Sequence, residues 1–170
     1  MAQLGFLLDQ RYCIGCQGCE TACQARNEAP IGISLRTADS FEYKESAPFL
    51  TVSCSHCEEP ACVATCPVKA ITKNPENGIV KTDYAICIGC KACIAVCPYG
   101  APKYSEDKKV SMKCDFCADR QAAGENPACI DGCPVKVLTF GELESLGGEK
   151  STEEFEYSEK TKPAFRFIKK

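Results

Sequence analysis

The chain has no tryptophan, a single histidine and no run of 18 apolar residues. A membrane-spanning helix needs roughly 20 such residues, so no segment is expected to cross a bilayer. The apolar stretch GFLL near the start is far too short for a secretory signal peptide. A formal net charge of −3 argues against nucleic acid as a partner. No nucleophile–base constellation, glycine-rich phosphate loop or pterin site is discernible.

The ordinary apolar core is small for the length of the chain. Of 170 residues, 45% are hydrophobic, but this figure includes 16 cysteines, and only eight residues are phenylalanine. The length suits one domain or two small fused modules. Structural metal binding can supply on the order of 10 kcal/mol per site toward folding. We therefore expect metal groups to replace part of the core, and the apoprotein to lose its fold.

The cysteines fall into four groups of four, numbered here one to four along the sequence. Group three has the spacing C-x2-C-x2-C-x3-C-P of bacterial ferredoxins, and group one shares it with Gln24 in the proline position. Groups two and four lengthen only the gap before the third cysteine, and both keep C-x3-C-P. This repeated pattern predicts four [4Fe-4S] clusters and electron transfer. The groups are Cys13, Cys16, Cys19, Cys23; Cys54, Cys57, Cys62, Cys66; Cys87, Cys90, Cys93, Cys97; and Cys114, Cys117, Cys129, Cys133.

The spacing has a physical cause. Three thiolates from one tight loop can bind three irons of a cube, whereas the fourth cysteine points away and ligates a different cluster. Gly15, Gly18 and Gly89 allow the backbone to curl around the cube. The proline after the fourth cysteine is expected to begin a following helix. Sixteen ligands would then hold four cubes, in two pairs that exchange their fourth ligands.

Two other uses of cysteine are disfavoured by the pattern. An even count in a cysteine-rich chain is typical of a disulfide framework. Twelve of the sixteen cysteines, however, belong to three-cysteine loops whose members are too close to pair usefully with one another. Zinc ribbons need two CxxC pairs rather than triplets followed by C-x3-C-P.

The chain contains an internal repeat. DQRYCIGCQGC at 9–19 matches DYAICIGCKAC at 83–93, and PACVATCPVK at 60–69 matches PACIDGCPVK at 127–136. Groups one and three are therefore of one type, and groups two and four are of another. The sequence thus predicts a duplicated two-cluster unit.

Strand patterns indicate how the repeat closes. Residues 70–83 read as a β-hairpin that joins group two to group three. Residues 137–143 and 5–9 stand in the corresponding places after group four and before group one, so we expect these two strands to pair. The predicted fold class is α+β, with two duplicated ferredoxin-like modules, one split around the other. The expected ranges are 1–53 with 98–145 for the split module, 54–97 for the intact module and 146–170 for a charged C-terminal extension. Two consecutive modules, groups one with two and three with four, remain the alternative.

The motifs CIGCQGCETAC, SCSHCEEPAC, CIGCKACIAVCPYGAPKY and KCDFCADRQAAGENPACIDGCP carry a resemblance that spans most of the chain. The chain resembles the four-cluster electron-transfer subunits of the dimethyl sulfoxide reductase family of molybdenum and tungsten oxidoreductases. Some relatives have tryptophan and a [3Fe-4S] cluster where this chain has Cys90, so four full cubes are expected. The resemblance implies these ligand sets: Cys13, Cys16, Cys19 with Cys133; Cys114, Cys117, Cys129 with Cys23; Cys54, Cys57, Cys62 with Cys97; and Cys87, Cys90, Cys93 with Cys66.

The same resemblance implies a non-catalytic subunit of an anaerobic respiratory enzyme. It would relay electrons between a molybdenum- or tungsten-containing catalytic subunit and another redox partner. A membrane-anchor or flavin subunit is a further candidate partner. The segments 23–54 and after 133 look short for the dimethyl sulfoxide reductase subunit, which leaves the catalytic partner open. The alternative function is a freestanding soluble carrier. The expected location is cytoplasmic, unless a partner carries the protein across a membrane.

Several other residues have two interpretations each. His56 either donates to a cluster sulfur or faces solvent. Lys69 and Lys136 either raise the local potential or are exposed helix residues, and the second interpretation is preferred. Tyr99 and Tyr104 are expected to pack against a cluster loop. Residues 141–162 are expected to form a solvated, charged connector. The end PAFRFIKK alternates apolar and polar residues, which predicts an edge strand on another chain or on this chain's own outer face; a frayed tail is the alternative.

Overall fold

The computed structural model describes residues 2–41 and 48–170; residue 1 and residues 42–47, which belong to the expected range 1–53, lie outside this part. The described chain is built from short strands and helices that separate the four cysteine groups. The strands are β1 (Leu4–Asp9), β2 (Arg36–Ser40), β3 (Phe49–Ser53), β4 (Ile71–Lys73), β5 (Val80–Thr82), β6 (Lys103–Ser105), β7 (Val110–Met112), β8 (Leu138–Glu142) and β9 (Phe165–Ile168). The helices are α1 (Gly18–Asn27), α2 (Ala61–Ala64), α3 (Ala92–Val96), α4 (Ala118–Ala122) and α5 (Ala128–Asp131).

The first strand pairs with the strand that follows group four. β1 and β8 are antiparallel, with Leu4 opposite Glu142 and Leu8 opposite Leu138. Phe6 and Leu8 alternate along β1 and are only 1% and 0% exposed, because one face of this sheet covers the largest apolar cluster. The predicted pairing between residues 5–9 and 137–143 is confirmed.

The C-terminal segment adds a third strand to this sheet. β9 runs parallel to β1, with Phe6 opposite Phe165 and Leu8 opposite Phe167. Phe165 and Phe167 are fully buried and stack on each other, with ring centroids 5.0 Å apart. The prediction of an edge strand on the chain's own outer face is confirmed, and the frayed tail is wrong. The apolar alternation decides this outcome, because burial of two phenylalanines offsets the entropy of ordering a terminus.

The charged connector before β9 is only partly solvated. Most of its charged side chains are exposed, but Phe155 is 5% exposed and packs on Phe165 and Phe167. Tyr99 stacks on Phe155 at 4.8 Å, and its hydroxyl accepts a hydrogen bond from the Ser158 backbone N–H. The expectation of a solvated connector was therefore wrong at its apolar positions.

Three further hairpins accompany the cysteine groups. The β4–β5 hairpin between groups two and three is confirmed. Hairpins β2–β3 and β6–β7 precede groups two and four, so the repeat includes two more strands in each half. Each of these hairpins covers a cluster loop: a Cβ at Gly15 would meet the Phe49 ring, and one at Gly89 would meet the Lys109 carbonyl oxygen. Both glycines have φ of +65°, a left-handed conformation that favours glycine.

The prolines of C-x3-C-P end helices instead of beginning them. Pro67, Pro98 and Pro134 lie in turns after α2, α3 and α5, so the expected helix start at these prolines was wrong. A proline lacks the N–H that would continue a helix, which explains their place after its last turn. The helices α2 and α5 begin directly after a different pair of prolines, Pro60 and Pro127.

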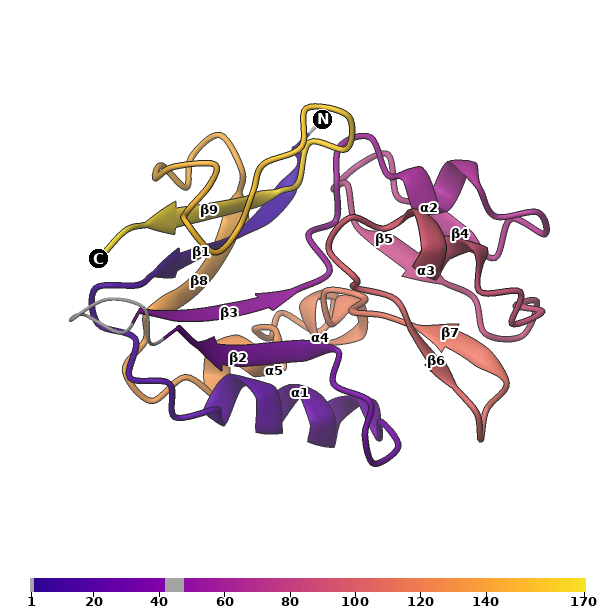
Figure 1. Cartoon of the computed structure of the whole chain (residues 1–170), viewed down its shortest axis with the longest axis horizontal. Helices are drawn as coiled ribbons and strands as arrows, with labels where there is room; N and C mark the ends of the chain where they lie inside the picture. Colours follow the sequence, from indigo (N-terminus) through magenta and orange to yellow (C-terminus); the bar gives the residue numbers. More distant parts are fainter. Residues whose placement is uncertain (1, 42–47) are drawn as a thin grey trace.

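The helices of groups one and four lie on one side of the molecule, and those of groups two and three lie on the other (Figure 1). Figure 1 shows the early part of the sequence (indigo) and its late part (orange and yellow) together on one side, with α2, α3, β4 and β5 (magenta) on the other. Helix α1 packs against α5, and α2 packs against α3. No helix in the described residues is long and apolar enough to cross a membrane.

Candidate iron–sulfur centres

The helices place one cysteine of each group in the same way. The third cysteine is the second residue of its helix in every group: Cys19 in α1, Cys62 in α2, Cys93 in α3 and Cys129 in α5. All sixteen cysteines lie in the described residues, and none forms a disulfide.

Groups one and four lie next to each other. Burial is the main cause of the raised pKa of the Cys13 thiol, and nearby Cys19 and Cys133 raise it further. Burial likewise raises the pKa of Cys23 to about 12, with a contribution from Cys129 of group four. The fourth cysteine of each of these two groups thus lies among the cysteines of the other group.

Groups two and three are neighbours in the same manner. Burial raises the pKa of Cys57 and of Cys62 to about 12, and Cys97 of group three contributes to both shifts. Cys66 of group two packs with Cys93 of group three in one apolar cluster. The backbone N–H of the residue four positions later donates to the Cys66 sulfur over 3.2 Å.

These buried thiols lose their protons readily only when a positive charge lies close by. Burial disfavours the thiolate, so thiolates that form here need positive charge close by. Iron supplies that charge, and metal binding and deprotonation are coupled. Among residues 2–41 and 48–170, no three His, Cys, Asp or Glu side chains converge as they would on a single metal ion. That arrangement does not suit a tetrahedral zinc site, whereas the thiolates of a cube bind different irons.

Two buried hydrogen-bond donors suit a bound iron–sulfur cluster. Arg36 Nε and His56 Nε2 are fully buried and have no partner in the described part of the chain. Unpaired buried donors are costly, so each calls for an acceptor. Cluster sulfurs accept such bonds.

Hydroxyl groups contact the third cysteine of groups one and three. Thr51 Oγ1 lies 3.2 Å from the Cys19 sulfur. The Ser111 hydroxyl is buried without a hydrogen-bond partner in the described part of the chain, and it lies close enough to Cys93 to lower the pKa that burial raises. Thr51 and Ser111 each stand three residues before the first cysteine of the next group. The sequence motifs alone did not single them out; extending the repeat alignment upstream of groups two and four would have found this shared hydroxyl position.

His56 is buried, so the solvent-facing interpretation was wrong. Its ring is 1% exposed, and Nδ1 accepts a hydrogen bond of 3.0 Å from the Val80 backbone N–H. Burial, chiefly, keeps the pKa of His56 well below its usual value, and the neutral ring then carries its proton on Nε2.

The tyrosines and lysines singled out from the sequence have mixed outcomes. Tyr104 packs beside the group-three loop as predicted, with Lys91 Nζ 3.8 Å from its ring centroid, whereas Tyr99 packs on the C-terminal extension. Lys69 and Lys136 are exposed as predicted, but they lie in left-handed turns instead of helices.

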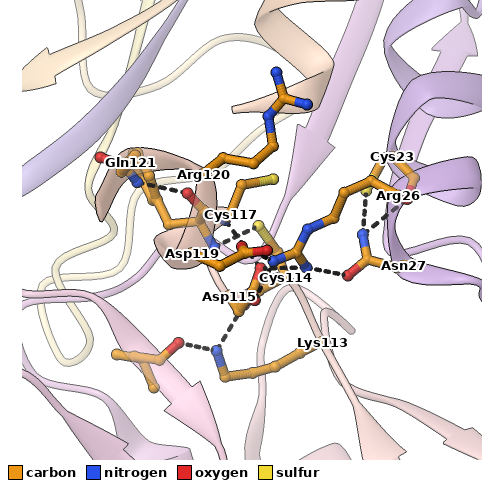
Figure 2. A network of polar contacts seen from close by, with 12 residues as sticks. Cys23, Arg26, Asn27, Lys113, Cys114, Asp115, Cys117, Asp119, Arg120 and Gln121 are labelled. Carbon is orange, nitrogen blue, oxygen red and sulfur yellow. Dashed lines mark hydrogen bonds and ion pairs between the residues drawn. The ribbon is translucent and has the colours of Figure 1, made fainter. Parts of the chain in front are cut away.

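An ion-pair network ties α1 to the group-four loop (Figure 2). Arg26 Nη2 lies 2.9 Å from an Asp115 carboxylate oxygen and also pairs with Asp119. Asn27 Nδ2 donates to the Cys23 carbonyl oxygen over 2.7 Å and to its sulfur over 3.4 Å. These contacts hold the end of α1 beside the cysteines of group four.

Comparison with known proteins agrees with this geometry. The family model of the 4Fe-4S dicluster domain matches residues 46–143, and a 4Fe-4S binding domain matches residues 12–26. The sequence is 40% identical over 156 residues to the B subunit of anaerobic dimethyl sulfoxide reductase of Escherichia coli K12, covering 85% of this chain and 76% of that protein. The protein belongs to the family of the 4Fe-4S dicluster domain.

Two further relatives have the same character. The thiosulfate reductase electron transfer subunit PhsB of Salmonella typhi is 43% identical over 150 residues, covering 84% of this chain and 77% of that protein. Protein NrfC of Escherichia coli K12 is 39% identical over 153 residues, covering 86% of this chain and 69% of that protein. The predictions of [4Fe-4S] centres and of a non-catalytic electron-transfer subunit are thereby confirmed.

Proposed function

We propose that this chain holds four [4Fe-4S] clusters and relays electrons through them between a catalytic subunit and another redox partner. The observation that carries the proposal is the position of two fourth cysteines next to the paired group: Cys133 lies near Cys13, and Cys97 lies near Cys57. A cluster supplies one-electron redox chemistry when bound.

The neighbour relations support four complete ligand sets. Each set takes three cysteines from one group and the fourth from the group that packs against it. The proposed sets are Cys13, Cys16, Cys19, Cys133; Cys114, Cys117, Cys129, Cys23; Cys54, Cys57, Cys62, Cys97; and Cys87, Cys90, Cys93, Cys66.

We propose further that the fold is two ferredoxin-like modules, with one split around the other. The pairs β1–β8 and α1–α5 support a module made from residues 1–53 and 98–145, whereas β4–β5 and α2–α3 support the intact module 54–97. Hairpin β6–β7, within the range 98–145, also covers the group-three loop of the intact module. Consecutive modules would require groups one and two to share ligands, and the neighbour relations run against this.

The chain's own side chains prepare these sites for electron transfer. Eight of the sixteen cysteines are buried and six are partly buried, which limits the access of water. Thr51 and the backbone N–H of Ala70 bond to the Cys19 and Cys66 sulfurs. Such bonds orient the ligands and tune the metal centre. Of the sixteen cysteines, Cys16 and Cys90 are exposed, in the loops of groups one and three, where a partner could approach.

The partner we favour is a molybdenum- or tungsten-containing catalytic subunit. Similarity to the B subunit of one reductase and to the electron transfer subunit of another supports a place in such a complex. A membrane-anchor or flavin subunit is the proposed second partner, and a freestanding carrier is the alternative. The cytoplasmic location stays a prediction.

Metal analysis of the native protein tests the proposal. Anaerobically purified protein should contain about sixteen iron and sixteen acid-labile sulfide, from four clusters of four. A reproducible plateau at about eight iron would contradict the four-cluster count. Size-exclusion chromatography from the native cells separates the two functions: a complex with molybdenum or tungsten supports the relay, and a lone 18.4 kDa species supports the carrier.

A further inference from the structure

Two cationic side chains lie inside the protein without a carboxylate partner. Arg36 and Lys113 are each 1% exposed, and neither forms an ion pair with a carboxylate of the described residues. A buried charge without a counter-charge costs several kcal/mol, which folding rarely tolerates. Each cation therefore requires an anion other than a carboxylate of the described residues.

Arg36 is surrounded by neutral groups and thiols. Its Nη1 donates to Thr51 Oγ1 over 3.2 Å, its Nη2 donates to Ser53 Oγ over 2.9 Å, and its Nε is unpaired. The guanidinium carbon lies 4.8 Å from the centroid of the Phe6 ring. Burial opposes the charge of Arg36, yet thiolates of groups one and four, with Cys129 foremost, raise its pKa above its usual value.

The contact with Thr51 also sets the direction of a second hydrogen bond. Because Arg36 Nη1 donates to Thr51 Oγ1, the hydroxyl proton remains free for the Cys19 sulfur, 3.2 Å away. The guanidinium thus acts on group one through this hydroxyl and on group four directly.

Lys113 has a corresponding position beside group two. Its Nζ donates to the Cys114 carbonyl oxygen over 2.8 Å and to the Val80 carbonyl oxygen (Figure 2). Lys113 also lies close enough to Cys62 for its charge to act on that sulfur. The side chain therefore brings its positive charge near a ligand of group two.

The repeat brings the two cations to equivalent sites. Lys113 directly precedes Cys114, and Ser53 directly precedes Cys54, so Ser53 and Lys113 are matching positions. Arg36, from β2, places its Nη2 on Ser53 and so brings a positive charge to the site that Lys113 fills in the other half. Two unrelated side chains supply the same charge at the same site, which a purely steric role does not explain.

We propose that Arg36 and Lys113 are fixed counter-charges for the two inner clusters, those whose first ligands, Cys114 and Cys54, lie near each other. Arg36 serves the Cys114 cluster, and Lys113 serves the Cys54 cluster; this assignment rests on the ligand sets proposed above. Reduction adds one electron from the redox partner and makes the cluster more negative, with no bond formed or broken. A nearby fixed cation favours the reduced form and so raises the midpoint potential.

The test is an EPR-monitored redox titration of the four-cluster protein with Arg36→Gln and Lys113→Met. Glutamine removes the charge and retains hydrogen-bonding capacity toward Thr51 and Ser53. Each variant should lower the midpoint potential of one cluster by at least about 59 mV. For a one-electron couple, this is a tenfold change in the equilibrium constant of reduction. Arg36→Gln should move the signal that Cys23→Ser alters, and Lys113→Met should move the signal that Cys97→Ser alters.

Charge-retaining and surface variants are the controls. Arg36→Lys and Lys113→Arg should keep the midpoint potentials close to those of the wild type, and Lys81→Met, at an exposed lysine of β5, should change none of them.

Unchanged potentials in the neutral variants with about sixteen iron bound would overturn the counter-charge role while leaving the four-cluster function intact. An equal shift of all four signals, or an equal effect of Arg36→Lys and Arg36→Gln, would also overturn it. If Arg36→Gln fails to bind iron, the comparison of Lys113→Met with Lys113→Arg tests the proposal by the same shift in midpoint potential. A wild-type iron content of about eight would instead defeat the proposed ligand sets.

Discussion

His56 and Phe116 occupy the same position in the two halves of the repeat and pack against each other. Each stands two residues after the first cysteine of its group, and both backbones are left-handed, with φ of 42° and 61°. Their ring centroids are 5.0 Å apart at an interplanar angle of 72°, and both side chains are almost fully buried. The contact marks the place where the halves meet, close to the two buried cations.

Phe116→Ala should strongly destabilise the protein. The Phe116 ring stacks on Phe6 at 4.2 Å and contacts His56, so its removal leaves a cavity on both sides of the contact. We expect a loss of about 3–5 kcal/mol, measured as earlier loss of cluster absorbance in anaerobic guanidinium titration. Ile31→Ala, at a fully exposed side chain, is the control and should change stability by less than about 0.5 kcal/mol. Equal denaturation midpoints for the two variants would show that Phe116 contributes no more to stability than an exposed residue does.

His56→Phe tests the polar half of the same contact. This change makes the two halves alike but removes the acceptor of the Val80 N–H, which leaves a buried donor unpaired. We expect a cost of about 1–3 kcal/mol in the same titration. A variant as stable as the wild type would show that the hydrogen bond contributes little at this site.

Cysteine variants test the crossed ligand sets. Cys13→Ser and Cys133→Ser should perturb one and the same EPR signal, although 120 residues separate them, since 133 − 13 = 120. Cys23→Ser should alter a different signal, and all three changes should spare the two clusters of the intact module. If Cys13→Ser and Cys66→Ser disturbed the same signal, the modules would be consecutive.

Arg26→Met should weaken the link between α1 and group four. The side chain is 18% exposed and pairs with Asp115 and Asp119, so its loss should cost about 1 kcal/mol. The hydrogen bond from Arg26 holds the pKa of Asp119 below its usual value, so its stabilisation is complete above about pH 4 and is lost only as pH falls through the lower folded pKa. The difference between variant and wild type should therefore be constant from about pH 5 to pH 8. A difference that vanished within that range would exclude the ion pair as its cause.

Deleting Ala164–Lys170 should destabilise the chain itself. The deletion removes β9 from the sheet edge and uncovers Phe155, which packs on Phe165 and Phe167. Phe167→Ala alone should cost about 3–5 kcal/mol, read from thermal loss of the cluster absorbance under anaerobic conditions. Lys160→Ala, at an exposed position of the connector, serves as the control. Unchanged thermal loss after the deletion would mean that β9 contributes nothing to the fold.

Local patterns in the sequence were sufficient to predict the centres and several strands. Ligand spacing is a short-range property, because three cysteines of one loop bind one cluster, and this is visible in residues 87–97 alone. The alternation in 163–170 predicted β9, and the repeat predicted the pairing of β1 with β8. The prediction that the proline after Cys66 begins a helix was wrong. A proline lacks the backbone N–H, and this suits the residue after a helix as well as the first turn of one.

The tertiary structure alone decided which residues surround the clusters. The sequence could not show that Arg36 and Lys113 are buried, because cationic side chains are exposed in most proteins and only packing removes them from water. The same holds for His56, whose place between Phe116 and Val80 depends on two segments far from it in the sequence. Ligand identity is a local property of the sequence, whereas the charges and hydrogen bonds that tune the ligands arise where distant segments meet.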